Sequence, residues 1–335
     1  MKKILSAFLI VLMLLSVASL AGCSNKPLQM GVGVHAYVEK ASNADGDTNG
    51  EGEAVVTVAA VLLDAEGKIV QCAIDVADNK VAYTSEGKYV EAAEFKTKYE
   101  LGADYGMVTY AGSAKEWFEQ ADAFTALVAG KTLDQVKALV ADGGKGTEDV
   151  INAGCTIAVS DFVLAIEEAV SNATDADATA NDTLQQGIVS TQASSKDATA
   201  EAAGANEVDT TVVAAAVGKD GKVTAMVADA LQAKFEFDAK GVTTVKAEDA
   251  ITTKREAGAN YGMTQYGQDL NGDGTVKEWF EQADAFDATC IGKTASEISA
   301  LAIDTGYGVD TLQTAGCTIH VGDLVKAAVK AATVA

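Results

Sequence analysis

Two threonines in identical five-residue segments have the residue types and surroundings best suited to chemistry. The shared sequence Ala-Gly-Cys-Thr-Ile comprises Ala153, Gly154, Cys155 and Thr156 in the first segment and Ala315, Gly316, Cys317 and Thr318 in the second, each followed by isoleucine. Each segment precedes a predicted helix, whose first N–H groups and positive dipole end suit a phosphate. The glycine allows a tight turn and the approach of a bulky group. A hydroxyl here can carry a phosphate ester, whereas the simpler interpretation is a turn with a capping threonine.

The two segments belong to a longer internal repeat. Residues 116–124 recur unchanged as 278–286, and 153–157 recur as 315–319, both shifted by 162 positions. Residues 102–107 recur with one substitution as 258–263, and the second copy has an insertion within 268–275. Nine identical residues in a row indicate duplication of one domain. We expect domains over 28–172 and 183–335, joined by a linker over 173–182 that is rich in Ala, Asp, Asn and Thr.

The elements expected to position the threonines are strands followed by helices. Strand-like runs cover 31–38, 54–63 and 68–76, and again 211–217 and 222–227. Capping boxes are predicted at Ser113/Glu116, Thr275/Glu278, Thr132/Gln135 and Thr294/Glu297, and a last helix is expected over 160–170. The prediction is an α+β fold with two tandem copies of one domain, each an antiparallel β-meander followed by three helices.

The first 23 residues have the pattern of an export signal. Lys2 and Lys3 precede an apolar run over 4–20, and residues 20–23 are Leu-Ala-Gly-Cys, with small residues before Cys23. This tetrapeptide resembles the lipobox of bacterial lipoproteins. The resemblance implies removal of signal peptide 1–22, a lipid on the sulfur of Cys23, a tether over 23–27, and a location on the extracytoplasmic face of the membrane of the Gram-positive type. A short membrane span is the alternative, but the run is below the usual length of about 20 residues.

The charge and the cysteines exclude several classes of protein. The net charge of −23 repels nucleic acid and anionic headgroups, so contact with the membrane is left to the lipid. With two histidines and no Cys-x-x-Cys, the chain lacks the usual zinc or haem ligands. We interpret Cys72, Cys155, Cys290 and Cys317 as small buried hydrophobic residues, not as disulfides. Two EF-hand-like loops, 45–50 and 269–274, lack the closing acid and are predicted to be polar turns.

The threonine segments and their neighbours together resemble a known family. Ala-Gly-Cys-Thr is similar to the Ser/Thr-Gly-Ala-Thr signature at which flavin transferases attach FMN, through its phosphate, to a threonine. With the lipobox, Gly-Ala-Asp/Asn-Tyr-Gly-Met and Lys-Glu-Trp-Phe-Glu-Gln-Ala-Asp-Ala-Phe, the ordered set resembles the PplA-type flavinylated lipoproteins of flavin-based extracellular electron transfer. The resemblance implies one covalent FMN on each of Thr156 and Thr318.

The same resemblance implies an electron carrier and its partners. These are a flavin transferase, a quinone-linked donor in the membrane, and extracellular acceptors such as ferric iron or soluble flavins. The chain departs from the family pattern at Cys155 and Cys317, where alanine is usual. The aspartate that usually precedes the threonine by six residues corresponds to Asp149, seven before Thr156, and Asp310, eight before Thr318.

Aromatic residues beside the repeated motifs are candidates to stack on a flavin ring. They are Tyr105, Tyr261, Trp117 and Trp279, whereas Phe118, Phe124, Phe280 and Phe286 are expected in the core.

Two other functions remain open. One is a surface lipoprotein that binds a small ligand or a cell-wall partner without a cofactor, and the other is a flavin-dependent reductase. Catalysis by a Ser-His-Asp or Cys-His arrangement is not expected, because His35 and His320 have no counterpart in the other copy.

Overall fold

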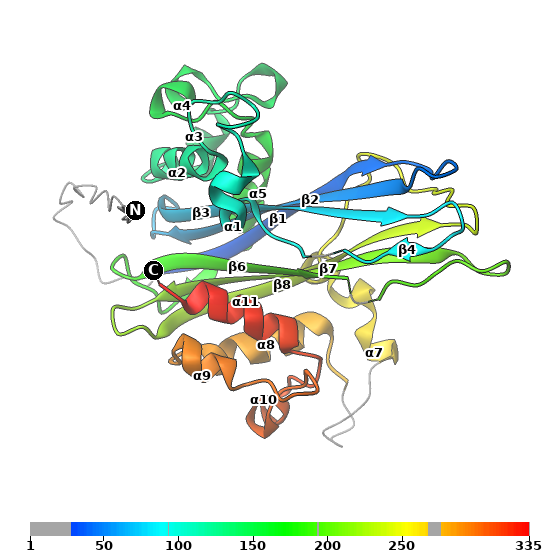
Figure 1. The fold of residues 1–335 in the computed structure, drawn as a ribbon. Coiled ribbons are helices and arrows are strands. Elements are labelled where there is room, and N and C mark those ends of the chain that lie inside the picture. Colours follow the sequence, from blue (N-terminus) through cyan, green and yellow to red (C-terminus); the bar gives the residue numbers. More distant parts are fainter. Residues whose placement is uncertain (1–27, 93, 193, 267–275, 335) are drawn as a thin grey trace, which may run out of the picture.

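The computed structural model describes residues 28–92, 94–192, 194–266 and 276–334, and the protein is α+β. Two antiparallel sheets lie between two groups of helices (Figure 1). The predicted signal peptide, Cys23, the tether and the acidic loop at 269–274 lie outside the described residues. Among the helices described, none is long and apolar enough to span a membrane.

The first sheet is a meander with one added strand. It contains β1 (Leu28–Ala41), β2 (Gly50–Leu63), β3 (Ile69–Tyr83), β4 (Tyr89–Val90) and β5 (Thr174–Ala176), in the order β4-β3-β2-β1-β5. Strand β5 pairs with the start of β1, although it lies in the segment predicted to be a linker. The linker prediction missed this strand because its short polar sequence has no apolar alternation. The second sheet has the order β6 (Thr183–Thr191), β7 (Gly204–Val217) and β8 (Val223–Phe237).

The helices follow the main strands in both halves, in the same order except for η2 in the first half and α7 in the second. In the first half they are α1 (Lys98–Leu101), η1 (Gly102–Tyr105), α2 (Trp117–Val128), α3 (Leu133–Lys137), η2 (Asp142–Gly144), α4 (Glu148–Ala153) and α5 (Ser160–Ser171). In the second half they are α6 (Lys254–Ala257), η3 (Gly258–Tyr261), α7 (Met263–Tyr266), α8 (Trp279–Cys290), α9 (Ala295–Ser299), α10 (Asp310–Ala315) and α11 (Gly322–Ala332). The prediction of three helices per half was too low, because the added helices are of three to six residues and too short for an apolar period.

Helix capping agrees with the sequence at one pair of predicted sites and differs at the other. Thr132 and Thr294 form capping boxes with Gln135 and Glu297, as predicted. Helix α2, however, begins after Glu116, whose N–H donates to the Glu119 carboxylate at 2.8 Å. The prediction of Ser113 as the capping residue was wrong, because the Glu116 carboxylate reaches beyond the helix to the loop before it. Helix α8 likewise begins after Glu278, and Thr275, its predicted cap, lies outside the described residues.

The central strand of each sheet is buried on both faces. In β2, Ala59, Val61 and Leu63 pack under the helices of the first half, whereas Val58, Ala60 and Leu62 pack against the other sheet. In β7, Val213, Ala215 and Val217 face the helices of the second half, whereas Val212, Ala214 and Ala216 face the first sheet. The protein is therefore a four-layer arrangement of helices, sheet, sheet and helices (Figure 1).

Corresponding residues of the two halves meet between the sheets. The Tyr83 and Phe237 rings, which end β3 and β8, stack with their centroids 4.6 Å apart. Asn79 donates to the Thr210 hydroxyl at 2.9 Å across the same layer. A patch that meets its own counterpart is typical of a contact with two-fold symmetry.

Polar contacts at the two edges of this layer, where a helix of one half meets a helix of the other half, differ in charge. On one side Lys330 of α11 forms an ion pair with Glu100 of α1. On the other side the position that corresponds to Lys330 is Glu168 of α5, and it lies near Glu256 of α6. Burial, reinforced by the charge of Glu256, raises the pKa of Glu168 from 4.5 to about 7. An attractive contact on one side thus corresponds to a repulsive one on the other.

Glu168→Gln should stabilise the protein at pH 8 and leave its stability nearly unchanged at pH 4. The amide still accepts from the Val34 N–H, which bonds Glu168 at 3.0 Å. The folded-state pKa is above the ordinary value, so the native state loses stability as pH rises from about 4.5 through about 7. We expect a gain of about 1 kcal/mol at pH 8, discounted for solvent near the carboxylate. Urea unfolding at both pH values measures it.

The matched control is Glu66→Gln, at an exposed turn, which should change stability little at either pH. An equal effect of Glu168→Gln at pH 4 and pH 8 would contradict the electrostatic explanation.

Candidate functional site

Each of the two candidate threonines follows the end of a short helix that a glycine terminates. Gly154 ends α4 with φ of 103°, and Gly316 ends α10 with φ of 98°. These left-handed conformations favour glycine. The next residue, Cys155, is fully buried and donates its N–H to the Val150 carbonyl at 3.1 Å. The buried cysteine fixes the segment, and the Thr156 side chain that follows is exposed.

A buried glutamine of helix α2 binds Thr156 twice. The backbone N–H and the Oγ1 hydroxyl of Thr156 both donate to Gln120 Oε1, at 2.8 and 2.9 Å. The Gln120 side chain is 1% exposed, and its Nε2 donates to the Ser113 hydroxyl and the Lys115 carbonyl, both at 3.1 Å. These bonds fix the orientation of the amide. The Thr156 hydroxyl hydrogen is therefore directed at Gln120, and the oxygen lone pairs face away from it.

The second threonine has the same arrangement. The Thr318 N–H and hydroxyl donate to Gln282 Oε1 at 2.9 and 3.0 Å. Gln282 is 3% exposed and donates from Nε2 to the Lys277 carbonyl at 3.0 Å. Thr318 is half-buried, so its surface is less open than that of Thr156.

A lysine lies across the glycine at each site. A Cβ placed on Gly154 would overlap the ammonium of Lys115, and one on Gly316 would overlap that of Lys277. The glycines therefore serve two purposes, since they allow both the turn and the approach of this ammonium. An ammonium against the glycine two residues before the threonine is suited to an anionic substituent on that threonine.

The sequence suggested that each threonine lies at the positive N-terminal end of a helix, but in the structure the next helix begins four residues later. Helix α5 begins at Ser160 after Val159, four residues beyond Thr156, and α11 begins at Gly322. Neither threonine is an N-cap, and Thr156 bonds a different helix, so the capping interpretation was wrong. The positive charge at the first site comes from Lys115.

A third repeated motif joins the same cluster through a glutamate. The Glu116 carboxylate accepts from the Met107 N–H at 2.9 Å, and Glu278 accepts from the Met263 N–H at 2.9 Å. Hydrogen bonds, first that from the Thr264 hydroxyl, hold the pKa of Glu278 below its ordinary value. The three motifs that recur in the sequence thus meet in space at both sites.

The candidate aromatic residues surround a second lysine. The Lys98 ammonium is 5.1 Å from the ring centre of Tyr105 and 5.8 Å from that of Trp117. In the second half Lys254 is 5.0 Å from Tyr261 and 5.4 Å from Trp279. The tyrosines are half-buried, and the two tryptophans are 4% and 5% exposed within the helix–sheet core. Phe124 and Phe286 are fully buried, which confirms their core assignment.

The acidic residues before the threonines occupy unequal positions. Asp149 is the second residue of α4, whereas Asp310 is the first residue of α10. Both are exposed. The residue that corresponds to Asp310 is Glu148, which begins α4 and precedes Thr156 by eight positions. Aligning the first residues of α4 and α10 pairs Glu148 with Asp310, whereas a search for an aspartate at a fixed distance before each threonine selected Asp149 instead.

The four cysteines among the described residues are free, as the sequence suggested. Cys155, Cys290 and Cys317 are buried, and Cys72 is partly buried. Burial raises the pKa of the Cys155 thiol above its ordinary value and that of Cys317 to about 12. The thiol beside each threonine is therefore neutral at physiological pH and is no competing nucleophile.

The second site has a neighbouring cavity that the sequence did not indicate. This cavity, of about 350 Å³, has Lys254, Trp279, His320 and Lys326 in its lining. The His320 ring lies 4.0 Å from that of Tyr307, between centroids. The corresponding residues of the first half are Ala158 and Lys145, so the repeat gave no signal for this histidine.

Neither a metal site among the described residues nor a similarity to a known protein assigns a further function to the chain. The loop at Asp45 is a turn closed by two bonds with Thr48, as predicted. Within the described part of the chain, no group of three His, Cys, Asp or Glu side chains is placed to hold a metal ion. No family model, curated protein or solved structure matches the chain.

Proposed function

We propose that this protein is a cell-surface lipoprotein that carries two covalently attached FMN groups, on Thr156 and Thr318. In this proposal it consists of two copies of one domain and relays electrons from a quinone-linked membrane donor to extracellular acceptors, ferric iron or soluble flavins. The observation that carries the proposal is the recurrence, in both halves, of an accessible threonine held by a buried glutamine beside a lysine.

The threonine environment fits a phosphate ester. Thr156 is exposed, and its oxygen lone pairs are not used by Gln120, so a flavin transferase can reach the oxygen. Esterification removes the hydroxyl hydrogen, but the Thr156 N–H continues to donate to Gln120 Oε1. The segment therefore keeps one of its two anchors after modification. Lys115 offers an ammonium to the phosphate charge.

Electron exchange is the chemistry that a bound flavin supplies, while the protein contributes tethering and electrostatics. At the second site, the cavity with Trp279 and Lys254 in its lining offers an aromatic edge and positive charge beside the Thr318 segment. Covalent attachment suits a protein outside the cell, where a dissociated cofactor diffuses away. A lipid on Cys23 keeps such a carrier near its donor.

Thr156→Ala and Thr318→Ala should each remove one FMN, and the double variant should be colourless but folded. Each substitution deletes one hydroxyl hydrogen bond, at a cost of about 1 kcal/mol, which is small beside a typical stability of about 5–15 kcal/mol. Intact mass after co-expression with a flavin transferase in a secreting host counts the flavins, and circular dichroism checks the fold. Serine at either position should retain flavin, since the nucleophilic oxygen remains.

Two flavins on the double alanine variant would falsify the ester assignment. An unmodified protein without flavin, when the transferase is active on another target, would favour the ligand-binding lipoprotein instead. Flavin loading together with turnover of a separate reducible substrate would favour the reductase.

Gln120→Leu should lower flavin loading at Thr156 while loading at Thr318 continues. Leucine offers no acceptor to the Thr156 N–H and hydroxyl, so the segment loses its anchor. The reciprocal variant Gln282→Leu should lower loading at Thr318 only. Peptide mapping of the modified threonines measures both. If either variant lowers loading equally at both sites, the loss reflects general misfolding and not a local anchor.

Cys23→Ala should abolish lipid attachment and release the protein from the membrane. Metabolic labelling with a fatty acid, followed by detergent partitioning, compares this variant with the unmodified chain. Equal labelling of the two forms would contradict the assignment of Cys23.

A further inference from the structure

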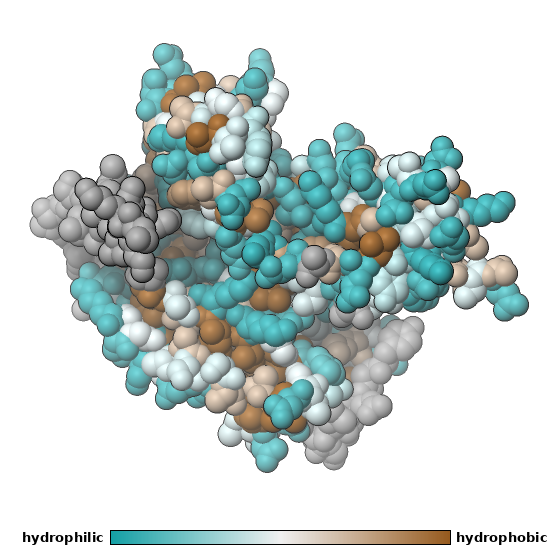
Figure 2. All heavy atoms as spheres, in the orientation of Figure 1, coloured by the Kyte–Doolittle hydropathy of each residue, from teal (hydrophilic) through white to brown (hydrophobic). Residues whose placement is uncertain are grey.

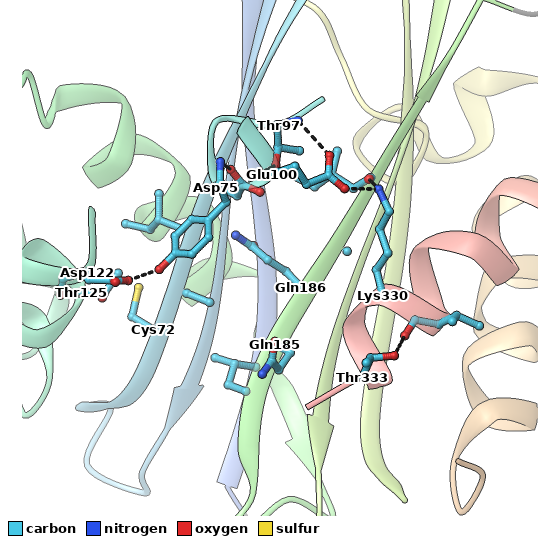
Figure 3. Close-up of a pocket in the computed structure, with 17 residues that line it drawn as sticks. Cys72, Asp75, Thr97, Glu100, Asp122, Thr125, Gln185, Gln186, Lys330 and Thr333 are labelled. Carbon is cyan, nitrogen blue, oxygen red and sulfur yellow. Dashed lines mark hydrogen bonds and ion pairs between the residues drawn. The ribbon is translucent and has the colours of Figure 1, made fainter. Parts of the chain in front are cut away.

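A cleft between the two halves lies away from both threonines. Its volume is about 770 Å³, within the range of small-molecule sites. Its walls are β3, α1 and α2 of the first half and β6 and α11 of the second (Figure 3). Figure 2 shows the hollow between the upper and lower helices, with apolar side chains along its lower edge. Ile74, Leu184, Ile188 and Val329 supply much of the apolar lining.

The charged groups of the cleft are mainly acidic. Asp75, Glu100 and Asp122 line it, whereas Lys330 is the one basic residue in its lining. Lys330 is already paired with Glu100 at the rim. Asp75 is 8% exposed, and burial raises its pKa to about 6, so it is mostly ionised at pH 7.5. The lining thus has an excess of negative charge at that pH.

One acceptor in the cleft has no partner. Gln186 of β6 reaches into the space between the two walls (Figure 3). Its Oε1 is buried and makes no hydrogen bond among the described residues. A buried oxygen without a partner is costly, and a donor on a ligand would relieve this cost.

The other half shows what complements the corresponding carboxylates. Asp229 and Asp284 occupy the positions of Asp75 and Asp122, and an arginine, Arg255, occupies the position of Tyr99. The Arg255 guanidinium pairs with Asp284 at 2.7 Å and with Asp287 at 3.0 Å, and its backbone N–H donates to Asp229 at 3.2 Å. The protein itself therefore supplies a planar cation on that side.

The cleft lacks this internal cation. Tyr99, in the position of Arg255, instead donates its hydroxyl to Asp122. Thr125 stands in the position of Asp287. The two sides thus share one aspartate pair, but only the side with Arg255 has a guanidinium among these carboxylates.

We propose that the cleft binds a small organic cation, an amidinium, guanidinium or ammonium group on an apolar body. The cation lies beside Asp122, which corresponds to the Asp284 that pairs with the Arg255 guanidinium, with the charge of Asp75 nearby, and it donates to Gln186 Oε1. The apolar body packs on Ile74 and Ile188. This site goes beyond the proposed electron relay and does not depend on the flavins.

Calorimetric titration of the full mature chain at pH 7.5 tests the charge requirement. The probes are benzamidine and its uncharged analogue benzamide, which have nearly the same shape. Benzamidine should bind at least about tenfold more tightly, because only the amidinium pairs with the carboxylates. Equal affinities, or no heat from either probe up to about 10 mM, would overturn the proposal.

Matched variants locate the binding. Asp75→Asn should weaken benzamidine binding about tenfold or more, whereas Asp284→Asn, on the other side, should leave it unchanged. Tyr99→Arg should abolish binding, because the new guanidinium occupies the cleft as Arg255 does opposite, and circular dichroism verifies its fold. Unaltered binding in both Asp75→Asn and Tyr99→Arg would place the cation elsewhere and refute the site.

Discussion

The fold depends on burial of the two central strands on both faces. Strand β2 has alternate residues in two apolar clusters, one under the helices and one between the sheets, and β7 has the same distribution. A single sheet covered by helices on one side would leave half of these side chains in water, at a cost of about 25 cal/mol for each Å² of apolar surface. Packing of sheet against sheet removes that exposure. The helices are then confined to the two outer layers, and the segments that contain Thr156 and Thr318 lie in these layers.

The contacts of the two halves are alike in geometry but unlike in charge. The sheet–sheet layer is apolar and holds corresponding residues against each other, as Tyr83 and Phe237 show. At the edges of this layer, Glu168 corresponds to Lys330 and Tyr99 corresponds to Arg255. These exchanges change no backbone element, yet they place Arg255 and the Glu168/Glu256 contact on one side, and the Lys330–Glu100 ion pair and the open cleft on the other.

The sequence predicted the elements with strong periodicity and missed interactions between distant segments. The α+β class, the strands and the helix over 160–171 follow from local patterns. The two threonines were recognised because their segment recurs. Gln120 and Lys115 were not, because they lie 36 or more residues away and only the fold brings them to Thr156. Glu116 was assigned to the wrong partner, since a long-range bond to Met107 competes with the local cap. Strand β5 is too short and polar to be detected from its own sequence.

The four layers set the two threonine segments on opposite outer faces. Segment 153–157 follows α4 in one helical layer, and 315–319 follows α10 in the other (Figure 1). With about 10 Å for each step between layers, the two segments are separated by roughly 30 Å. Groups attached at the two faces are too far apart to touch within one molecule. Under the proposed function, neighbouring molecules would therefore have to meet face to face for their flavins to come into contact. Surface density, and not the internal geometry of one molecule, would then determine how far a charge travels along the cell surface.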